Sequence, residues 1–190
     1  RKEVKTVNRQ AVNPYLPSWE YIPDGEPHVF RDRLYVFGSH DLENGNEFCE
    51  QDYVSWSAPL DDLSDWRYEG VIYRKDQDPY NVNVLPLYAP DVVQGRDGRY
   101  YLYYCIKFQD SINVAVCDTP AGQYEFYGRV QYKDGQAMME NQTYDPSVIC
   151  TEEGNFLYFG FAPCMINIPR YKDQDLKGGS VLQLEDDMIT

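Results

Sequence analysis

Acidic side chains stand at the start of three similar segments of this sequence. Asp24 and Glu26 open the first segment, Asp91 lies at the start of the second, and Asp145 opens the third. If the three segments fold alike, their carboxylates converge from separate elements on one place. Carboxylates that converge in this way can hydrolyse a glycosidic bond, because one deprotonates water, another protonates the leaving oxygen, and a third adjusts their pKa values.

Each of the three segments reads as a β-hairpin. A short strand that contains or follows a proline leads through a polar turn, such as Asp97-Gly98, into a second strand of aromatic and apolar residues. The prolines stand at positions 27, 90 and 146, about 60 residues apart. Proline is tolerated at the beginning of a strand. The predicted strand pairs are 26–30 with 34–38, 89–93 with 100–104, and 145–149 with 156–160.

Two further strands follow the first hairpin, at 54–57 and 69–72, and two follow the second, at 114–117 and 127–130. Four short strands in about 60 residues are typical of one blade of a β-propeller. A β-sandwich also contains short strands at even spacing, but the matched proline-led hairpins favour the propeller. Because known propellers have at least about four blades, we expect residues 1–190 to be part of a single longer propeller domain.

The composition narrows the classes of partner. A net charge of −14 makes nucleic acid an unfavourable partner, and no apolar run approaches the roughly 20 residues of a membrane span. The 18 tyrosines suit both β-sheet packing and sugar stacking.

The cysteines and the start of the chain bear on where the protein works. The five cysteines are dispersed and odd in number, so we expect reduced core residues of a cytoplasmic protein. Since the chain opens on Arg1, a secreted or periplasmic protein whose signal peptide has been removed is the alternative.

These motifs resemble glycoside hydrolase family 43, which contains five-bladed β-propellers that cleave arabinose-, xylose- or galactose-containing glycans with inversion. Three stretches carry the resemblance: Glu26-Pro27-His28, Tyr88-Ala89-Pro90-Asp91 and Tyr144-Asp145-Pro146-Ser147. It extends from about Pro14 to the end of the chain. The resemblance implies an all-β, five-bladed propeller, about three blades of which lie in this chain.

The resemblance also implies roles for individual residues. The general base of the family stands at an Asp-Pro step that is Glu26-Pro27 here, and Asp24 lies two residues upstream, so Glu26 is the favoured candidate for the base and Asp24 is the alternative. Asp145 occupies the position that orients the general acid and modulates its pKa. Asp91, Tyr88 and His40 are expected to bind sugar. The family's general acid is a glutamate of the fourth blade, and we therefore expect residues 1–190 alone to be inactive.

The predicted function is that of an inverting glycosidase acting on arabinose- or xylose-containing plant oligo- or polysaccharides, with galactose-containing glycans as a further candidate. A propeller glycoside phosphorylase and a non-catalytic glycan-binding propeller are the alternatives. The phosphorylase requires a cationic cluster for phosphate, which this sequence lacks. No cofactor is expected to be required and no metal-binding residue is assigned, although the resemblance makes a calcium ion in the propeller channel a candidate.

Overall fold

The computed structural model describes residues 12–139, 143–160 and 179–190. The described residues form three antiparallel sheets, with strand orders β1-β2-β3-β4, β5-β6-β7-β8 and β9-β10-β11. The bounds are β1 Glu26–Phe30, β2 Arg33–Phe37, β3 Tyr53–Pro59, β4 Arg67–Tyr73, β5 Leu87–Gln94, β6 Tyr100–Ile106, β7 Ile112–Cys117, β8 Glu125–Arg129, β9 Ser147–Thr151, β10 Gly154–Phe159 and β11 Ser180–Leu184, with one short 3-10 helix, η1, at Lys75–Gln77. The predicted hairpins and outer strands are therefore confirmed.

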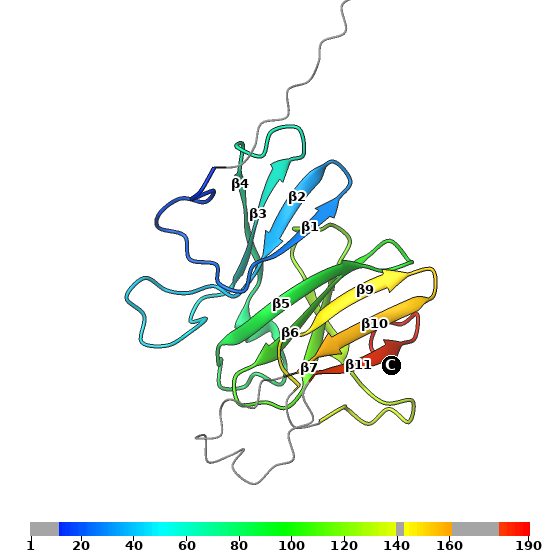
Figure 1. Ribbon diagram of the computed structural model, residues 1–190. Helices are drawn as coiled ribbons and strands as arrows, with labels where there is room; N and C mark the ends of the chain where they lie inside the picture. The colour runs from blue at the N-terminus through cyan, green and yellow to red at the C-terminus, as the bar shows by residue number, and fades with distance from the viewer. Residues whose placement is uncertain (1–11, 140–142, 161–178) are drawn as a thin grey trace, which may run out of the picture.

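The three sheets are arranged as adjacent blades (Figure 1). The green sheet β5–β8 lies between the blue-to-cyan sheet β1–β4 and the yellow-to-red sheet β9–β11, and the innermost strands β1, β5 and β9 approach one another. We number these sheets blades 1, 2 and 3. Because the first residues of the three inner strands meet at one end, side chains just before those strands are brought together.

Local sequence explains the two tightest hairpins. Phe30 pairs with Arg33, and Thr151 pairs with Gly154, so each turn contains only two residues between the paired positions. Arg31 (φ 59°) in the first turn adopts the left-handed conformation that two-residue hairpin turns favour. These short turns fix the register of both hairpins, which decides where the preceding acidic residues lie.

Tyrosine side chains fill the spaces between the blades. One core joins blades 1 and 2 and another joins blades 2 and 3. Tyr53, Tyr73, Tyr100, Tyr101, Tyr103, Tyr104 and Tyr124 are each no more than 1% exposed. Except for Tyr100, their hydroxyls find polar partners, as when Tyr104 donates to Asp78 at 2.5 Å. Many of the 18 tyrosines are thus explained by packing rather than by sugar binding.

Blades 1 and 3 each present an apolar face that points away from blade 2. Ile149, Tyr158 and Val181 of blade 3 are 48%, 49% and 53% exposed, and Val29 of blade 1 is 57% exposed. Side chains alternate between faces along a strand, so Ile149, Tyr158 and Val181 lie opposite the buried Val148 and Leu157 layer of blade 3. Faces of this kind are suited to packing against further sheets.

Four cysteines lie in the described residues, and all four are free thiols. Burial raises the pKa of Cys49 to about 11 and raises the pKa of Cys105 further still. The expectation of unpaired thiols holds for these four, and Cys164 lies outside the described residues. In the described ranges, no helix has the length and apolar character needed to cross a bilayer.

Candidate active site

A cavity of about 250 Å³ opens where the inner strands of the three blades begin. Three carboxylates line it, those of Asp24, Glu26 and Asp145, and its remaining wall is formed by Ala89, Pro90, Pro146 and Ser147. Its lining thus comes from all three blades. The structure therefore brings together the two candidate bases and the predicted pKa-modulating aspartate, as the repeat implies.

A left-handed residue precedes the inner strand of blades 1 and 3, and blade 2 has one near the start of its inner strand. Asp24, Ala89 and Asp145 have φ values of 54°, 33° and 51°. Non-glycine residues rarely adopt this conformation, and those that do cluster at functional sites. Two of the three are the aspartates of the cavity.

The hairpin registers identify the equivalent residues of blades 1 and 3. Strands β1 and β9 both have five residues and both end in two-residue turns, so Glu26 corresponds to Ser147 and Asp24 corresponds to Asp145. The alignment of Glu26-Pro27 with Asp145-Pro146, expected from the prolines, is therefore two residues out of register. Turn length sets the register of a hairpin, whereas a proline near the strand start does not.

Ser39 holds Asp24 in place. The Ser39 hydroxyl donates to Asp24 Oδ2 at 3.1 Å and accepts a hydrogen bond from the Ala89 amide at 2.8 Å. Ser39 is fully buried, so its contacts connect the left-handed turns of blades 1 and 2. The sequence offered no signal for this residue beyond its place in the stretch that follows the first hairpin.

Burial and neighbouring charge raise the pKa values of two cavity carboxylates. Desolvation raises the pKa of Glu26 most, the charges of Asp91 and Asp24 raise it further, and His28 lowers it. Desolvation also raises the pKa of Asp145, with a second contribution from the Asp24 charge. Asp24 is therefore electrostatically coupled to both of the other carboxylates in the cavity.

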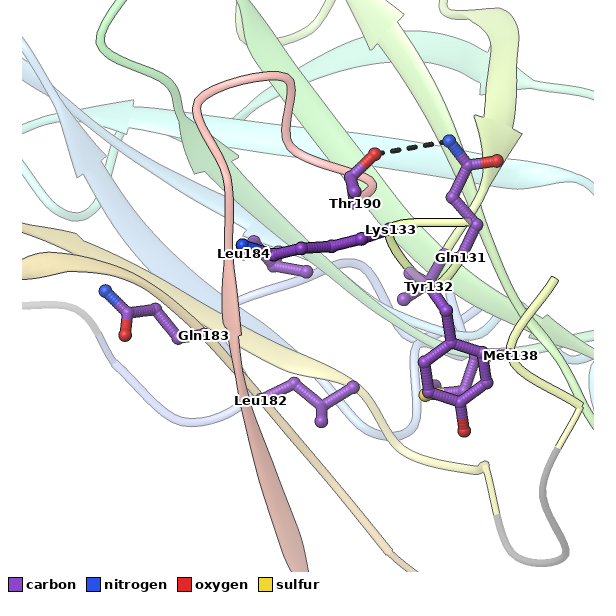
Figure 2. Close-up of a pocket in the computed structure, with 9 residues that line it drawn as sticks. Gln131, Tyr132, Lys133, Met138, Leu182, Gln183, Leu184 and Thr190 are labelled. Carbon is purple, nitrogen blue, oxygen red and sulfur yellow. Dashed lines mark hydrogen bonds between the residues drawn. The ribbon is translucent and has the colours of Figure 1, made fainter. Parts of the chain in front are cut away.

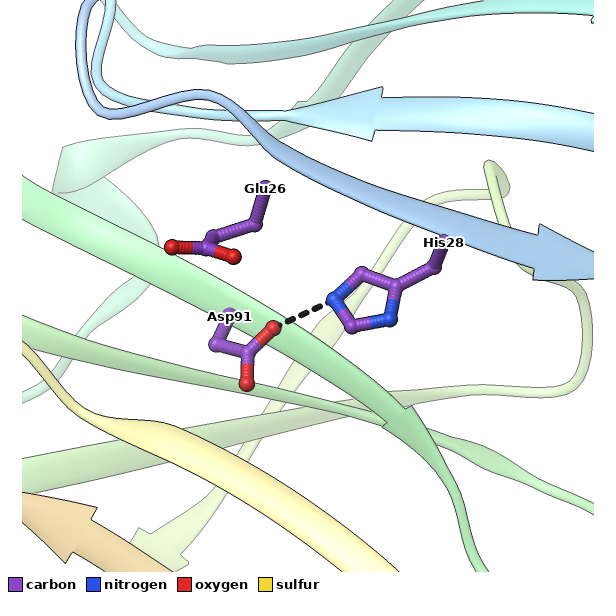
Figure 3. Close-up of side chains that lie close together, drawn as sticks. All are labelled: Glu26, His28 and Asp91. Atoms are coloured by element: carbon purple, nitrogen blue, oxygen red, sulfur yellow. Dashed lines mark hydrogen bonds and ion pairs between the residues drawn. The ribbon is translucent and has the colours of Figure 1, made fainter.

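Asp91 lies behind the cavity wall rather than in it. Its Oδ1 accepts hydrogen bonds from His28 Nε2 at 2.6 Å and from its neighbour's amide, Val92 N, at 2.8 Å, while Oδ2 accepts from Val148 N at 2.6 Å. Figure 3 shows His28 and Glu26 pointing from β1 toward Asp91 on β5. Asp91 is 1% exposed, and it joins the inner strands of all three blades instead of presenting its carboxylate to the cavity.

The other two predicted sugar ligands also lie outside the cavity lining. His40 bonds through Nε2 to Glu20 Oε1 at 2.9 Å and through Nδ1 to the Asp52 carbonyl at 2.7 Å, so both ring nitrogens are engaged in blade 1. This places His40 in a structural position in contrast to the expected contact with substrate. Tyr88 is half-buried beside the cavity wall, and burial raises the pKa of its hydroxyl to about 12.

The residues near the cavity do not fit a calcium ion. Glu26, His28 and Asp91 each offer one ligand atom, and these atoms lie within 4.8 Å of one another. Calcium takes about six to eight oxygen ligands, whereas this group includes an imidazole nitrogen. Both carboxylate oxygens of Asp91 already accept hydrogen bonds. We therefore assign no role to calcium in the described part of the chain.

A second cavity, of about 170 Å³, lies between the segment that follows β8 and the outermost described strand, β11 (Figure 2). Its lining is mainly apolar, with Met138, Leu182 and Leu184 among the residues. Its one lysine, Lys133, is exposed and ion-paired with Glu185 at 2.5 Å. No carboxylate lines it among the described residues, so it does not offer the chemistry of the first cavity.

Comparison with known proteins adds a family match. The sequence model of the family described as "Glycosyl hydrolases family 43" matches residues 31–180. The chain is 53% identical over 189 residues to a "Xylosidase/arabinosidase" from Thermoclostridium stercorarium, covering 97% of this chain and 38% of that protein. It is 31% identical to "Xylosidase/arabinosidase 43A" from Humicola insolens, covering 74% of this chain and 43% of that protein. The chain thus spans less than half the length of these relatives.

Solved structures give the same picture of the fold. A GH43_1 enzyme from Xanthomonas citri complexed with xylose matches with a TM-score of 0.66 and 25% identity, over 90% of this chain and 53% of that chain. A family 43 β-xylosidase/α-arabinofuranosidase from a compost microbial metagenome, in complex with xylotriose, matches with a TM-score of 0.67 and 24% identity, over 95% and 59%. These matches confirm the predicted all-β propeller fold, of which the three sheets are blades.

Proposed function

Because the chain belongs to glycosyl hydrolase family 43, we propose that the protein containing it is an inverting glycosidase that releases arabinose or xylose from plant glycans. The observation that carries the proposal is the pair Asp24 and Asp145, which face one cavity from equivalent left-handed turns of two blades. Convergent carboxylates on separate elements are the machinery of glycoside hydrolysis.

Asp24 is the general base in this proposal. Its carboxylate takes a proton from water as the water oxygen attacks the anomeric carbon, while the glycosidic bond breaks and a general acid protonates the leaving oxygen. Register equivalence with Asp145 and the hydrogen bond from Ser39 support Asp24 over Glu26. Both features give Asp24 a fixed position, which a base that must hold one water molecule requires.

Asp145 is the positioning carboxylate. Its charge, together with that of Asp24, would raise the pKa of a nearby acid and so keep that acid protonated at working pH. The carboxylates that line the cavity among the described residues are those of Asp24, Glu26 and Asp145, and this proposal assigns the general acid to none of them. We propose that the acid comes from another part of the same propeller domain, of which residues 1–190 form one portion. The exposed apolar faces of blades 1 and 3 support this arrangement.

The substrate class rests on the relatives and on the charge of the cavity. Two relatives are named for xylose and arabinose release, and the Xanthomonas citri structure holds xylose. The lining combines three carboxylates with no lysine, arginine or histidine among the described residues. A neutral sugar suits such a surface, whereas phosphate does not, and so the hydrolase is favoured over the phosphorylase.

The test is activity of the full-length protein on aryl arabinofuranosides and aryl xylosides. We expect release of the aryl group, and we expect Asp24→Asn and Asp145→Asn each to lower kcat/KM by roughly 10²–10⁴-fold without loss of folding. Asp118→Asn, which removes an exposed carboxylate remote from the cavity, serves as the matched control. Near-normal turnover in both cavity variants would remove this pair from the mechanism.

A further inference from the structure

Two acidic groups near the cavity, Asp24 and Asp91, are held by hydrogen bonds within the described residues, and Glu26 is not. Asp24 accepts a hydrogen bond from Ser39, and Asp91 accepts three, from His28, Val92 and Val148. Among the described residues, none donates a hydrogen bond to the Glu26 carboxylate, which lies in the cavity lining. Glu26 is thus an open acceptor at the place where a ligand would sit.

The surroundings of Glu26 are acidic on several sides. Asp24 precedes it on the same segment, Asp91 faces it from β5, Asp145 shares the cavity from blade 3, and His28 lies beside it on β1. The charge of Asp91 is compensated by its three N–H donors, and His28 is committed to Asp91 through Nε2. No lysine, arginine or histidine lines the cavity among the described residues, and the imidazole of His28 beside Glu26 is hydrogen-bonded to Asp91.

We propose that Glu26 is a specificity-determining residue that accepts a hydrogen bond from a hydroxyl of a neutral sugar and discriminates against sugars that carry a carboxylate. This inference rests on the proposed glycosidase function, in which Asp24 and not Glu26 is the base. A hydroxyl supplies the donor that the Glu26 carboxylate lacks. A uronic acid brings a further negative charge into a lining of three carboxylates and is repelled.

Position in the repeat supports this separation of roles. Glu26 is the residue equivalent to Ser147 of blade 3, which also lines the cavity with a polar side chain. The repeat thus has an aspartate at one position in both blades, and two residues later it has a side chain that can form hydrogen bonds. Glu26 and Ser147 line the same cavity as Asp24 and Asp145, so the second pair lies beside the first.

The experiment compares Glu26→Gln with Glu125→Gln in the full-length protein. Glu125 is exposed on the outer strand β8, so its variant removes the same charge without touching the cavity. For Glu26→Gln we expect KM for a neutral aryl pentoside to rise about 10- to 100-fold, the usual effect of weakening a hydrogen bond to a charged group, while kcat stays within about 3-fold. The ratio of inhibition constants for D-glucuronate and D-xylose should fall about 10-fold. Glu125→Gln should change neither.

Other outcomes would overturn the inference. A fall in kcat of about 1,000-fold with KM unchanged would make Glu26 the base, and unchanged kinetics and inhibitor ratio would leave it without a role. Glu26→Asp keeps the charge on a shorter side chain, so it should preserve discrimination against glucuronate even if KM rises. If the wild-type protein releases no sugar, the proposed function fails. The role of Glu26 is then tested separately by calorimetry, which measures the affinities of the wild type and of Glu26→Gln for D-xylose and for D-glucuronate. Equal affinity of both proteins for both sugars would overturn it.

Discussion

Replacement of Asp91 is expected to destabilise the protein more than any other single loss of a carboxylate around the cavity. The carboxylate is 1% exposed and accepts two backbone N–H groups, from Val92 and Val148, together with His28 Nε2. Val92 and Val148 are themselves 0% and 5% exposed. Water therefore has little access to the donors that the substitution leaves behind.

The magnitude follows from those donors. Each buried N–H without an acceptor costs about 1–3 kcal/mol, and His28 is exposed enough, at 27% of its side chain, to regain a water partner. Asp91→Ala should therefore lower the free energy of unfolding by about 3–5 kcal/mol. Asp91→Asn keeps one acceptor oxygen but places its amide NH₂ against one of the N–H groups that Asp91 accepts from. It should therefore lower the free energy of unfolding by about 2 kcal/mol. Both are large fractions of the roughly 5–15 kcal/mol that stabilises a typical domain.

The assay is equilibrium urea unfolding of the full-length protein followed by tryptophan fluorescence. Asp118→Asn is the matched control, because Asp118 is exposed, and surface substitutions usually change stability by no more than about 0.5 kcal/mol. A loss of less than 1 kcal/mol in Asp91→Ala would refute the reasoning that this carboxylate connects the three blades.

Two other predictions concern the cavity electrostatics and blade 1. Burial and the Asp91 charge raise the pKa of Glu26, and the Asp24 charge adds to this and to the raised pKa of Asp145. Asp24→Asn should therefore lower both pKa values, as measured by a carbon-13 NMR titration of the carboxyl groups. Unchanged pKa values would contradict the electrostatic coupling. A raised carboxyl pKa means that the folded state binds protons more tightly than the unfolded state does. Glu26 and Asp145 therefore contribute less to the free energy of unfolding as pH rises above their ordinary pKa values of 4.5 and 3.8. This pH-dependent loss of stability should be smaller in Asp24→Asn than in the wild type. His40→Ala should lower the free energy of unfolding by about 1–3 kcal/mol, because it leaves a buried carboxylate without one of its donors, while KM stays unchanged; a raised KM with unchanged stability would instead make His40 a substrate ligand.

The repeat and the blades could be predicted from local signals. Hairpin turns such as Asp97-Gly98 and the aromatic second strands are encoded within a few residues, and the observed strands follow them closely. Convergence of Asp24, Glu26 and Asp145 was also predictable, since it requires only that similar segments fold alike.

The register of the repeat was harder to predict, because the prolines are misleading anchors. Pro27 lies inside β1, whereas Pro146 precedes β9. The true register is set by the two-residue turns at Arg31-Asp32 and Glu152-Glu153. Counting back from those turns would have paired Asp24 with Asp145 from the sequence alone.

The positions of Asp91 and His40 depend on contacts that sequence does not reveal. Asp91 is committed to an amide 57 residues away in blade 3, and His40 to Glu20, which also accepts from Trp56 Nε1 at 2.7 Å. Motif position gave both residues an expected place at the substrate. Burial and long-range hydrogen bonding place both away from the cavity lining.

The stereochemistry of the first product tests the central claim most directly. Proton NMR of the full-length protein acting on an aryl arabinofuranoside or aryl xyloside should show the anomer opposite in configuration to the substrate appearing first, because a base-activated water attacks from the face opposite the leaving group. Loss of that signal in Asp24→Asn would place the base at the left-handed turn of blade 1. First appearance of the retained anomer, or no release of sugar from any of these substrates, would contradict the account.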